Sequence, residues 1–267
     1  MIRHDLPNGK AVFFDPEPHV YFDENGTELA GVTTVIRDIG GGPPAKYYER
    51  NAIEGLWELR RRYAWGGWPD CDPDDVLRWL EVEKLNSQAK FKDAGTTGTA
   101  VHNVFEAFGL GELSPMDILD GEDIVGADMA RLARLATWWQ ENVESVLHSE
   151  IVTASHSLGY AGTVDFVGHI KGFDGPGILD LKTSNYVQQK YHFQLDGYRE
   201  SYMESGYGET KWQAILHLPK EGEPRLVPNK APAGAFRRQL AVYRDCKAIS
   251  PPRKINRPSV PLESVAA

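Results

Sequence analysis

Cysteine is nearly absent from this chain, which carries only Cys71 and Cys246 among its 267 residues. The two lie far apart and form no Cys-x-x-Cys pair, so they exclude a four-thiolate zinc or iron–sulfur site. A chain of this length buries a substantial core without disulfides or structural metals. We therefore expect a reducing, cytoplasmic setting.

Three other features are missing from the sequence. No apolar run approaches the roughly 20 residues that a membrane helix needs. The first residues, Met-Ile-Arg-His-Asp-Leu, lack the apolar segment of a signal peptide. No Gly-x-x-x-x-Gly-Lys-Ser/Thr segment occurs, so the sequence predicts no ATP-binding loop. We expect a protein that neither binds a membrane nor uses ATP.

Basic residues are outnumbered, since 29 Lys and Arg face 38 Asp and Glu and give a net charge of −9. This balance argues against a protein that coats nucleic acid nonspecifically, but a local basic patch can still bind it. Two patches are present, at residues 60–63 and at residues 236–238 with Arg244. The first, followed by Trp65 and Trp68, interleaves cations and aromatics as single-strand grooves do. A helix end whose arginines complement the helix dipole, with packed tryptophans, is the simpler interpretation.

Hydrophobic periodicity predicts the order of helices and strands. Two short strands are expected within residues 11–30, around the turn Glu24-Asn25-Gly26. A helix start at residues 32–39 is stopped by the glycines and prolines of 40–44. Further helices are predicted at residues 45–63, 73–92, 97–108, 124–146, 186–205 and 234–249, and strands at 148–157, 160–171, 177–183 and 211–218. This order predicts an α/β sandwich around a small mixed sheet.

Helix caps and domain limits follow from the same pattern. We expect Asp72 to cap the helix that begins at Pro73, and Thr97 or Thr99 to cap the next helix. Ser184 or Asn185 is expected to cap the helix that follows the strand at 177–183. The chain divides into an N-terminal β-hairpin and helical region packed on the core (1–95), the core (96–249) and a loose, flexible C-terminal tail (250–267).

The segment Gly-Ile-Leu-Asp-Leu-Lys-Thr-Ser, residues 177–184, places an acid and a lysine two positions apart in an apolar run. Side chains of a strand alternate, so Asp180 and Lys182 share one face while Leu179 and Leu181 point into the core. Taken alone, this pair is most simply a solvated ion pair worth about 0–1 kcal/mol.

Asp165 changes that interpretation. If the strands at 160–171 and 177–183 form a hairpin, Asp165 lies near Asp180, and two carboxylates brought together repel unless a cation separates them. Mg²⁺ suits such a site because it prefers oxygen ligands and keeps waters. Lys182 beside that ion would orient or deprotonate a water, or neutralise charge on a phosphate.

Four more residues extend the pattern. His102 follows Gly98-Thr99 in the first turns of a helix, and Glu150 opens the strand before the hairpin. Gln194 and Tyr198 lie four apart, on one helix face. Each has a plain alternative: a core histidine bonded to a backbone carbonyl, an exposed glutamate, and ordinary polar groups of a helix surface.

Taken in order, Gly-Thr-x-x-His, Glu, Gly-x-x-Asp, Asp-x-Lys-Thr-Ser and Gln-x-x-x-Tyr resemble the RecB-like branch of the PD-(D/E)XK nuclease superfamily, over residues 98–198. The resemblance implies a restriction-endonuclease-like three-layer core. It implies Mg²⁺ or Mn²⁺ held by Asp165, Asp180 and His102, with Lys182 as the catalytic lysine. Glu150 would complete the catalytic set at the edge of the metal site. Substrate contacts would come from Gln194, Tyr198 and Thr183.

The function that this resemblance implies is a metal-dependent DNA exonuclease in recombination, repair or replication. Its partners would be single- or double-stranded DNA ends and a single-strand annealing or recombination protein. No proline precedes Asp165, but Gly-x-x-Asp is the common form of this motif in the RecB-like branch. The four cysteines of the iron–sulfur relatives are absent, so no iron–sulfur cluster is expected. By analogy, we expect a stand-alone nuclease of the size that phage genomes carry. The alternatives are a noncatalytic DNA-binding or scaffold protein on the same fold and a structure-specific endonuclease.

Overall fold

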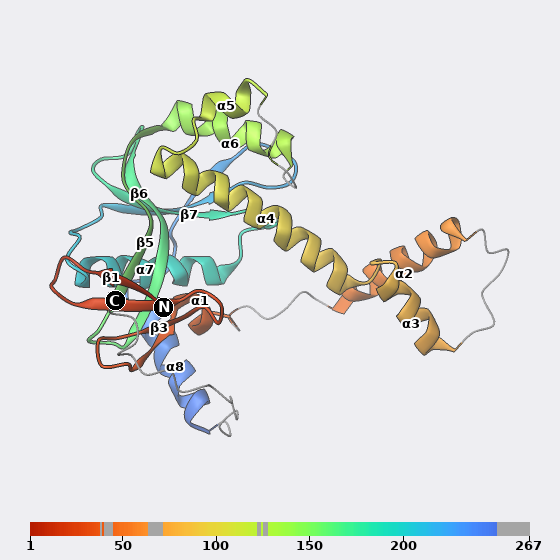
Figure 1. Ribbon diagram of the computed structural model, residues 1–267, viewed down its shortest axis with the longest axis horizontal. Coiled ribbons are helices and arrows are strands. Elements are labelled where there is room, and N and C mark those ends of the chain that lie inside the picture. Colours follow the sequence, from red (N-terminus) through yellow and green to blue (C-terminus); the bar gives the residue numbers. More distant parts are fainter. Residues whose placement is uncertain (38, 40–44, 64–71, 122–123, 125–127, 250–267) are drawn as a thin grey trace.

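The computed structural model describes all residues except 38, 40–44, 64–71, 122–123, 125–127 and 250–267. The predicted helix stop at 40–44, the tryptophans Trp65 and Trp68, and the predicted tail at 250–267 lie outside the described residues. The described part is a mixed α/β structure built on an open sheet (Figure 1).

Within the described residues, nine strands form one sheet in the order β1-β2-β3-β4-β6-β7-β8-β9, and β5 pairs with β6. The pairs β4–β6 and β7–β8 are parallel, and the remaining pairs are antiparallel. The strands are β1 Ile2–Asp5, β2 Ala11–Asp15, β3 Val20–Phe22, β4 Glu28–Gly31, β5 Val143–Ser155, β6 Tyr160–Ile170, β7 Gly177–Lys182, β8 Trp212–His217 and β9 Arg225–Pro228.

The N-terminal region is therefore richer in strands than predicted. Residues 2–31 form four strands rather than two, and β4 joins them to β6 through the pairs Ala30–Tyr160 and Gly31–Ala161. The sheet is thus larger than the small sheet expected, whereas residues 45–62 are helical as predicted. Strand β1 is exposed and polar, so its sequence gives no alternation that would reveal it.

The helices pack on this sheet or project from it. They are α1 Val32–Val35, α2 Ala45–Arg62, α3 Pro73–Val82, α4 Ser87–Leu110, α5 Pro115–Leu119, α6 Met129–Asn142, α7 Gln189–Glu204 and α8 Ala235–Ile249. Helices α2 and α3 project away from the sheet at the far end of α4 (Figure 1). In the described part of the chain, no helix combines the length and the apolar character that crossing a membrane requires.

The helix predicted at 73–92 is two helices. Its start is confirmed, because the Asp72 side chain accepts the Asp74 N–H at 2.8 Å. It ends at Val82, and α4 begins at Ser87 and crosses the expected domain limit at 95–96 without a break. The prediction that Thr97 or Thr99 caps this helix is wrong. The division of the chain into three regions stays a prediction.

Two other helix boundaries differ from the prediction. The helix expected at 124–146 ends at Asn142, because Val143 already pairs with Ile170 of β6. Strand pairing therefore overrides the helical pattern of the segment that follows. Helix α7 begins at Gln189, and neither Ser184 nor Asn185 caps it.

Apolar clusters cover both faces of β7. Leu179 and Leu181 pack with α4 and α6, whereas Ile178 packs with α1, α7 and α8. Both faces of the strand that carries Asp180 are thus buried. The interpretation of Asp180 and Lys182 as a solvated ion pair on an edge strand is therefore wrong. The first cluster centres on Phe166, which meets the Trp139 ring at 5.6 Å in a T-shaped contact.

We expect Phe166→Ala to lower the free energy of unfolding by about 3–5 kcal/mol, because it leaves a cavity in the core. The matched control is Phe173→Ala. The Phe173 side chain is 36% exposed and contacts only the edge of the core through Trp212, so we expect a loss of at most about 1.5 kcal/mol. Urea unfolding of both variants measures the difference, and equal losses would contradict this description of the core.

Candidate active site

Three carboxylates lie level with one another on three neighbouring strands. In the register of β5 and β6, Glu150 falls between the pairs Ser149–Phe166 and Ile151–Val164, which places it opposite Asp165. One step past the pair Phe166–Leu179, Asp165 lies opposite Asp180 of β7. The sheet therefore gathers three acids into one row, as the predicted hairpin required for two of them.

Asp180 and Lys182 form a buried ion pair. The Asp180 side chain is fully buried, and its Oδ2 lies 2.6 Å from Lys182 Nζ. Apart from this contact, its carboxylate oxygens have no hydrogen-bond partner among the described residues. Burial raises the pKa of Asp180 to about 7, although Lys182 acts in the opposite direction.

The Lys182 ammonium is held in its charged form. Burial alone would lower its pKa, but the charges of Asp180 and Asp165 outweigh burial and raise the pKa of Lys182. Its Nζ also lies 5.1 Å from the centre of the Tyr191 ring, so a cation–π contact supports the charge. In this state Lys182 is the counter-ion of the carboxylate row.

Asp165 links the row to two other elements. Its Oδ2 accepts the backbone N–H of Leu181 at 2.9 Å, which fixes the carboxylate against β7. The same oxygen lies 3.8 Å from Nδ1 of His102 on α4. Burial lowers the pKa of His102 more than Asp165 raises it, so the imidazole is biased toward its neutral form. A neutral imidazole is the form that binds a metal.

Glu150 adopts an unusual backbone conformation. It lies in the middle of β5, not at the start of the strand as predicted, and has φ 47°, in the left-handed region that non-glycine residues rarely adopt. Such backbone conformations cost about 1–3 kcal/mol and cluster at functional sites. Burial, then the charge of Asp165, raises the pKa of Glu150 to about 8.

These side chains open into a cavity of about 300 Å³. Its lining includes His102, Glu150, Asp165 and Lys182, but not the fully buried Asp180. Sequence reasoning missed several lining residues: Glu106 and Asn103 of α4, Thr163 of β6, and His19, Tyr21, Val32 and Thr33 of the N-terminal region. Glu106 lies one helical turn after His102, and that spacing alone could have revealed it.

The predicted substrate-contacting residues divide into two groups. Gln194 and Tyr198 both line the cavity, and the Gln194 amide donates to the Tyr198 hydroxyl at 2.8 Å. Burial keeps that hydroxyl protonated by raising its pKa well above the usual value. Thr183 does not line the cavity; instead, its Oγ1 faces Gly98 of α4.

The chemistry of the row fits a divalent cation, although the side chains are not yet arranged around one. Across the described residues, no three His, Cys, Asp or Glu side chains form a ready metal-binding group. Asp180 is paired with Lys182, and Asp180 does not line the cavity. Carboxylates with raised pKa values and an orphaned buried Asp180 oxygen are nevertheless what a hard cation would neutralise. While Lys182 pairs with Oδ2 of Asp180, Oδ1 is the oxygen that such a cation would use.

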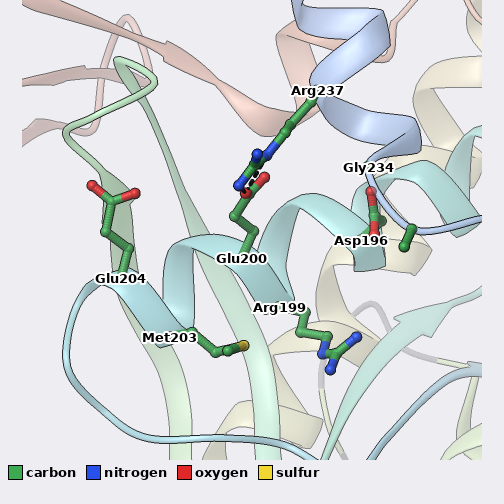
Figure 2. Close-up of a pocket in the computed structure, with 8 residues that line it drawn as sticks. Asp196, Arg199, Glu200, Met203, Glu204, Gly234 and Arg237 are labelled. Atoms are coloured by element: carbon green, nitrogen blue, oxygen red, sulfur yellow. Dashed lines mark hydrogen bonds and ion pairs between the residues drawn. The ribbon is translucent and has the colours of Figure 1, made fainter.

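A larger hollow, of about 720 Å³, lies between α7 and α8 (Figure 2). Its acids already have structural partners. Glu200 pairs with Arg237, the Asp196 carboxylate accepts the Phe236 N–H, and Glu204 accepts hydrogen bonds from the β5–β6 turn. These contacts hold α8 and the turn against α7, so we interpret the hollow as a structural boundary between packed elements. Arg237, which belongs to the second basic patch noted in the sequence, is one of the residues that line this hollow.

The first predicted basic patch is also engaged. It ends α2, where Arg61 and Arg62 both pair with Glu58, and Arg62 also reaches Glu83 of the α3 end. None of these residues lines the 300 Å³ cavity. Arg61 and Arg62 lie at the end of a helix, as the simpler interpretation of the sequence proposed, and there they form ion pairs with glutamates.

The pKa of Glu150 generates a prediction about stability. The folded pKa of about 8 exceeds the ordinary 4.5, so between these values the folded chain binds more protons than the unfolded chain. Without divalent cations, the free energy of unfolding should therefore fall as pH rises through this window. Glu150→Gln removes the titrating group and should exceed wild type in stability at pH values near 8, with the difference vanishing near pH 4.5.

Urea unfolding across that pH range measures the effect. The control is Glu144→Gln, which changes an exposed glutamate of the same strand. Wild-type and Glu150→Gln curves that stay parallel from pH 4.5 to 8 would rule out the raised pKa.

Comparison with known proteins assigns no family. No family model matches the chain, and no curated protein matches it. Among solved structures, a protein from Eubacterium rectale, provisionally described as an exonuclease, aligns with a TM-score of 0.41 and 12% identity. The alignment covers 82% of this chain and 79% of that one. A likeness at this level carries no argument about activity, so any assignment of function depends on the geometry of the cavity.

Proposed function

We propose that this chain is a metal-dependent deoxyribonuclease that hydrolyses phosphodiester bonds from DNA ends. The observation that carries the proposal is the row Glu150–Asp165–Asp180, which lies level across three strands. Lys182 contacts its Asp180 and His102 its Asp165, beside the cavity that Glu150 and Asp165 line. The ordered motifs of the RecB-like nucleases fall on these residues. The proposal includes that branch's restriction-endonuclease-like layering and its role in recombination, repair or replication.

Asp165, Asp180 and His102 would hold the cation, Mg²⁺ or Mn²⁺. A bound divalent ion supplies two things in such a site: a more acidic water as the nucleophile and stabilisation of the charge that develops on the phosphate. Asp165 already has one oxygen fixed by the Leu181 N–H, so it needs little reorganisation to keep its direction. The neutral bias of His102 leaves a ring nitrogen free to act as a ligand.

Lys182 would act as a charged donor rather than as a base. Its raised pKa keeps the ammonium protonated at neutral pH while Asp180 and Asp165 are its neighbours. With the cation held by the aspartates, Lys182 would keep its ammonium in the cavity that it lines. There it can donate a hydrogen bond to a phosphate oxygen and stabilise developing negative charge.

The size of the cavity favours one strand over a duplex. A volume of about 300 Å³ lies at the lower end of ligand pockets, so it admits roughly one nucleotide unit. A duplex whose major groove alone is about 12 Å wide does not enter it. A strand end reaches such a pocket without melting a long duplex, which supports an end-dependent reaction.

We expect Lys182→Ala to lower the degradation of linear DNA by at least about 100-fold, because it removes the charged hydrogen-bond donor that stabilises developing negative charge on the phosphate. The matched control is Lys171→Ala, which changes an exposed lysine at the end of β6 and should leave the rate unchanged. The assay uses end-labelled linear single and double strands and a closed circle, with Mg²⁺, Mn²⁺ or EDTA.

The outcomes separate the candidates. Loss of linear DNA with metal, spared circles and an inactive Lys182→Ala support the exonuclease. Cut circles would replace it with a structure-specific endonuclease. Wild-type rates in Lys182→Ala would refute the active site itself. DNA binding without cleavage under every condition would leave a noncatalytic binding protein, and a thermal shift with Mg²⁺ would then show whether the row binds a cation.

A further inference from the structure

The N-terminal region supplies one wall of the cavity, and His19 is an exposed member of that wall. This residue ends the turn between β2 and β3 and lines the cavity together with Tyr21, Val32 and Thr33. Its φ of 53° lies in the left-handed region, which histidine adopts more readily than most residues. The turn conformation thus presents the His19 side chain from a hairpin that is distant in sequence from every motif residue.

The His19 ring is held in place by other rings. It meets the Phe14 ring edge-on at 5.0 Å and the Tyr21 ring edge-on at 5.8 Å, while Phe14 and Tyr21 stack at 4.8 Å. The Tyr21 hydroxyl is in turn hydrogen-bonded to Thr163 Oγ1 at 2.9 Å. Thr163 precedes Asp165 by two residues on β6, and both line the cavity. The hairpin is therefore tied directly to the strand that carries the central acid.

The ring nitrogens of His19 have no hydrogen-bond partner among the described residues. The cavity is otherwise rich in acids, since Glu106, Glu150 and Asp165 line it and Lys182 is paired with Asp180. A polyanionic strand entering such a cavity needs donors from the protein as well as a cation. His19 is a hydrogen-bond donor on a wall without acids, and the rings of Phe14 and Tyr21 hold it there.

We infer that His19 is a substrate-contacting residue whose imidazole N–H donates a hydrogen bond to a backbone phosphate of a nucleic-acid strand in the cavity. This inference rests on the proposed function and deepens it. It adds a contact from outside the motif-bearing segment 98–198. Phe14 and Tyr21 position the ring through their edge-on contacts with it.

The test is His19→Asn, because asparagine also accepts the left-handed conformation and so removes the imidazole without straining the turn. His19→Gly is the second variant, for the same reason. Anisotropy of a short labelled single strand in EDTA measures affinity without cleavage, and initial rates in Mg²⁺ separate KM from kcat. We expect Kd and KM to rise about tenfold in both variants, the loss typical of one hydrogen bond to a charged group.

The matched control is His169→Asn, which changes a histidine of β6 that bonds Ser145 and does not line the cavity. Unchanged Kd and KM in both His19 variants, with Lys182→Ala still inactive, would overturn this inference and leave the proposed function standing. A lower melting temperature without a change in Kd would also overturn it, because the role would be structural. A wild-type chain that neither binds nor cleaves the strand would overturn both.

Discussion

The buried pair of Asp180 and Lys182 is the contact on which the rest of the site depends. Both faces of β7 are covered by apolar clusters, so a carboxylate at position 180 has no access to water. Removing one partner of such a pair leaves an uncompensated buried charge, which costs about 3–5 kcal/mol. A fold that only needed stability would do as well with two apolar residues there. The pair therefore indicates that position 180 is constrained by chemistry rather than by packing.

The helices α1, α4 and α7 approach the strands closely and form the walls of the cavity beside the row of acids. A Cβ at Gly162 would lie 2.8 Å from the Tyr198 ring of α7 and 3.0 Å from Val32 of α1, so glycine lets both helices reach β6 next to Asp165. Gly98 plays the same part for α4, since a Cβ there would lie 2.9 Å from Thr183 Oγ1. The glycines of the two motifs Gly-Thr-x-x-His and Gly-x-x-Asp thus have a steric reason that is independent of any resemblance.

What could be predicted from sequence was local. The hairpin of β6 and β7 follows from two alternating apolar runs and a glycine-rich turn, and it brings Asp165 opposite Asp180. The position of Glu150 in the middle of β5 was not predicted, and its left-handed conformation has no signal in its own sequence. Helix α4 begins ten residues before Thr97, because glycines inside a helix look like a boundary when the packing that they serve is unknown.

The wall formed by the N-terminal hairpin could not be predicted, for a different physical reason. Its position depends on the parallel pairing of Ala30 with Tyr160, a contact between residues 130 positions apart that no periodicity encodes. That pairing has a consequence for charge. The strands β5, β6 and β7 contribute the acids, whereas His19 comes from an element that the sheet recruits from outside them. In a chain of net charge −9, affinity for a polyanion has to be local. A hydrogen-bond donor from a distant hairpin gives the cavity local affinity for a polyanion. It does so without placing another positive charge beside the row of acids that has to bind the metal.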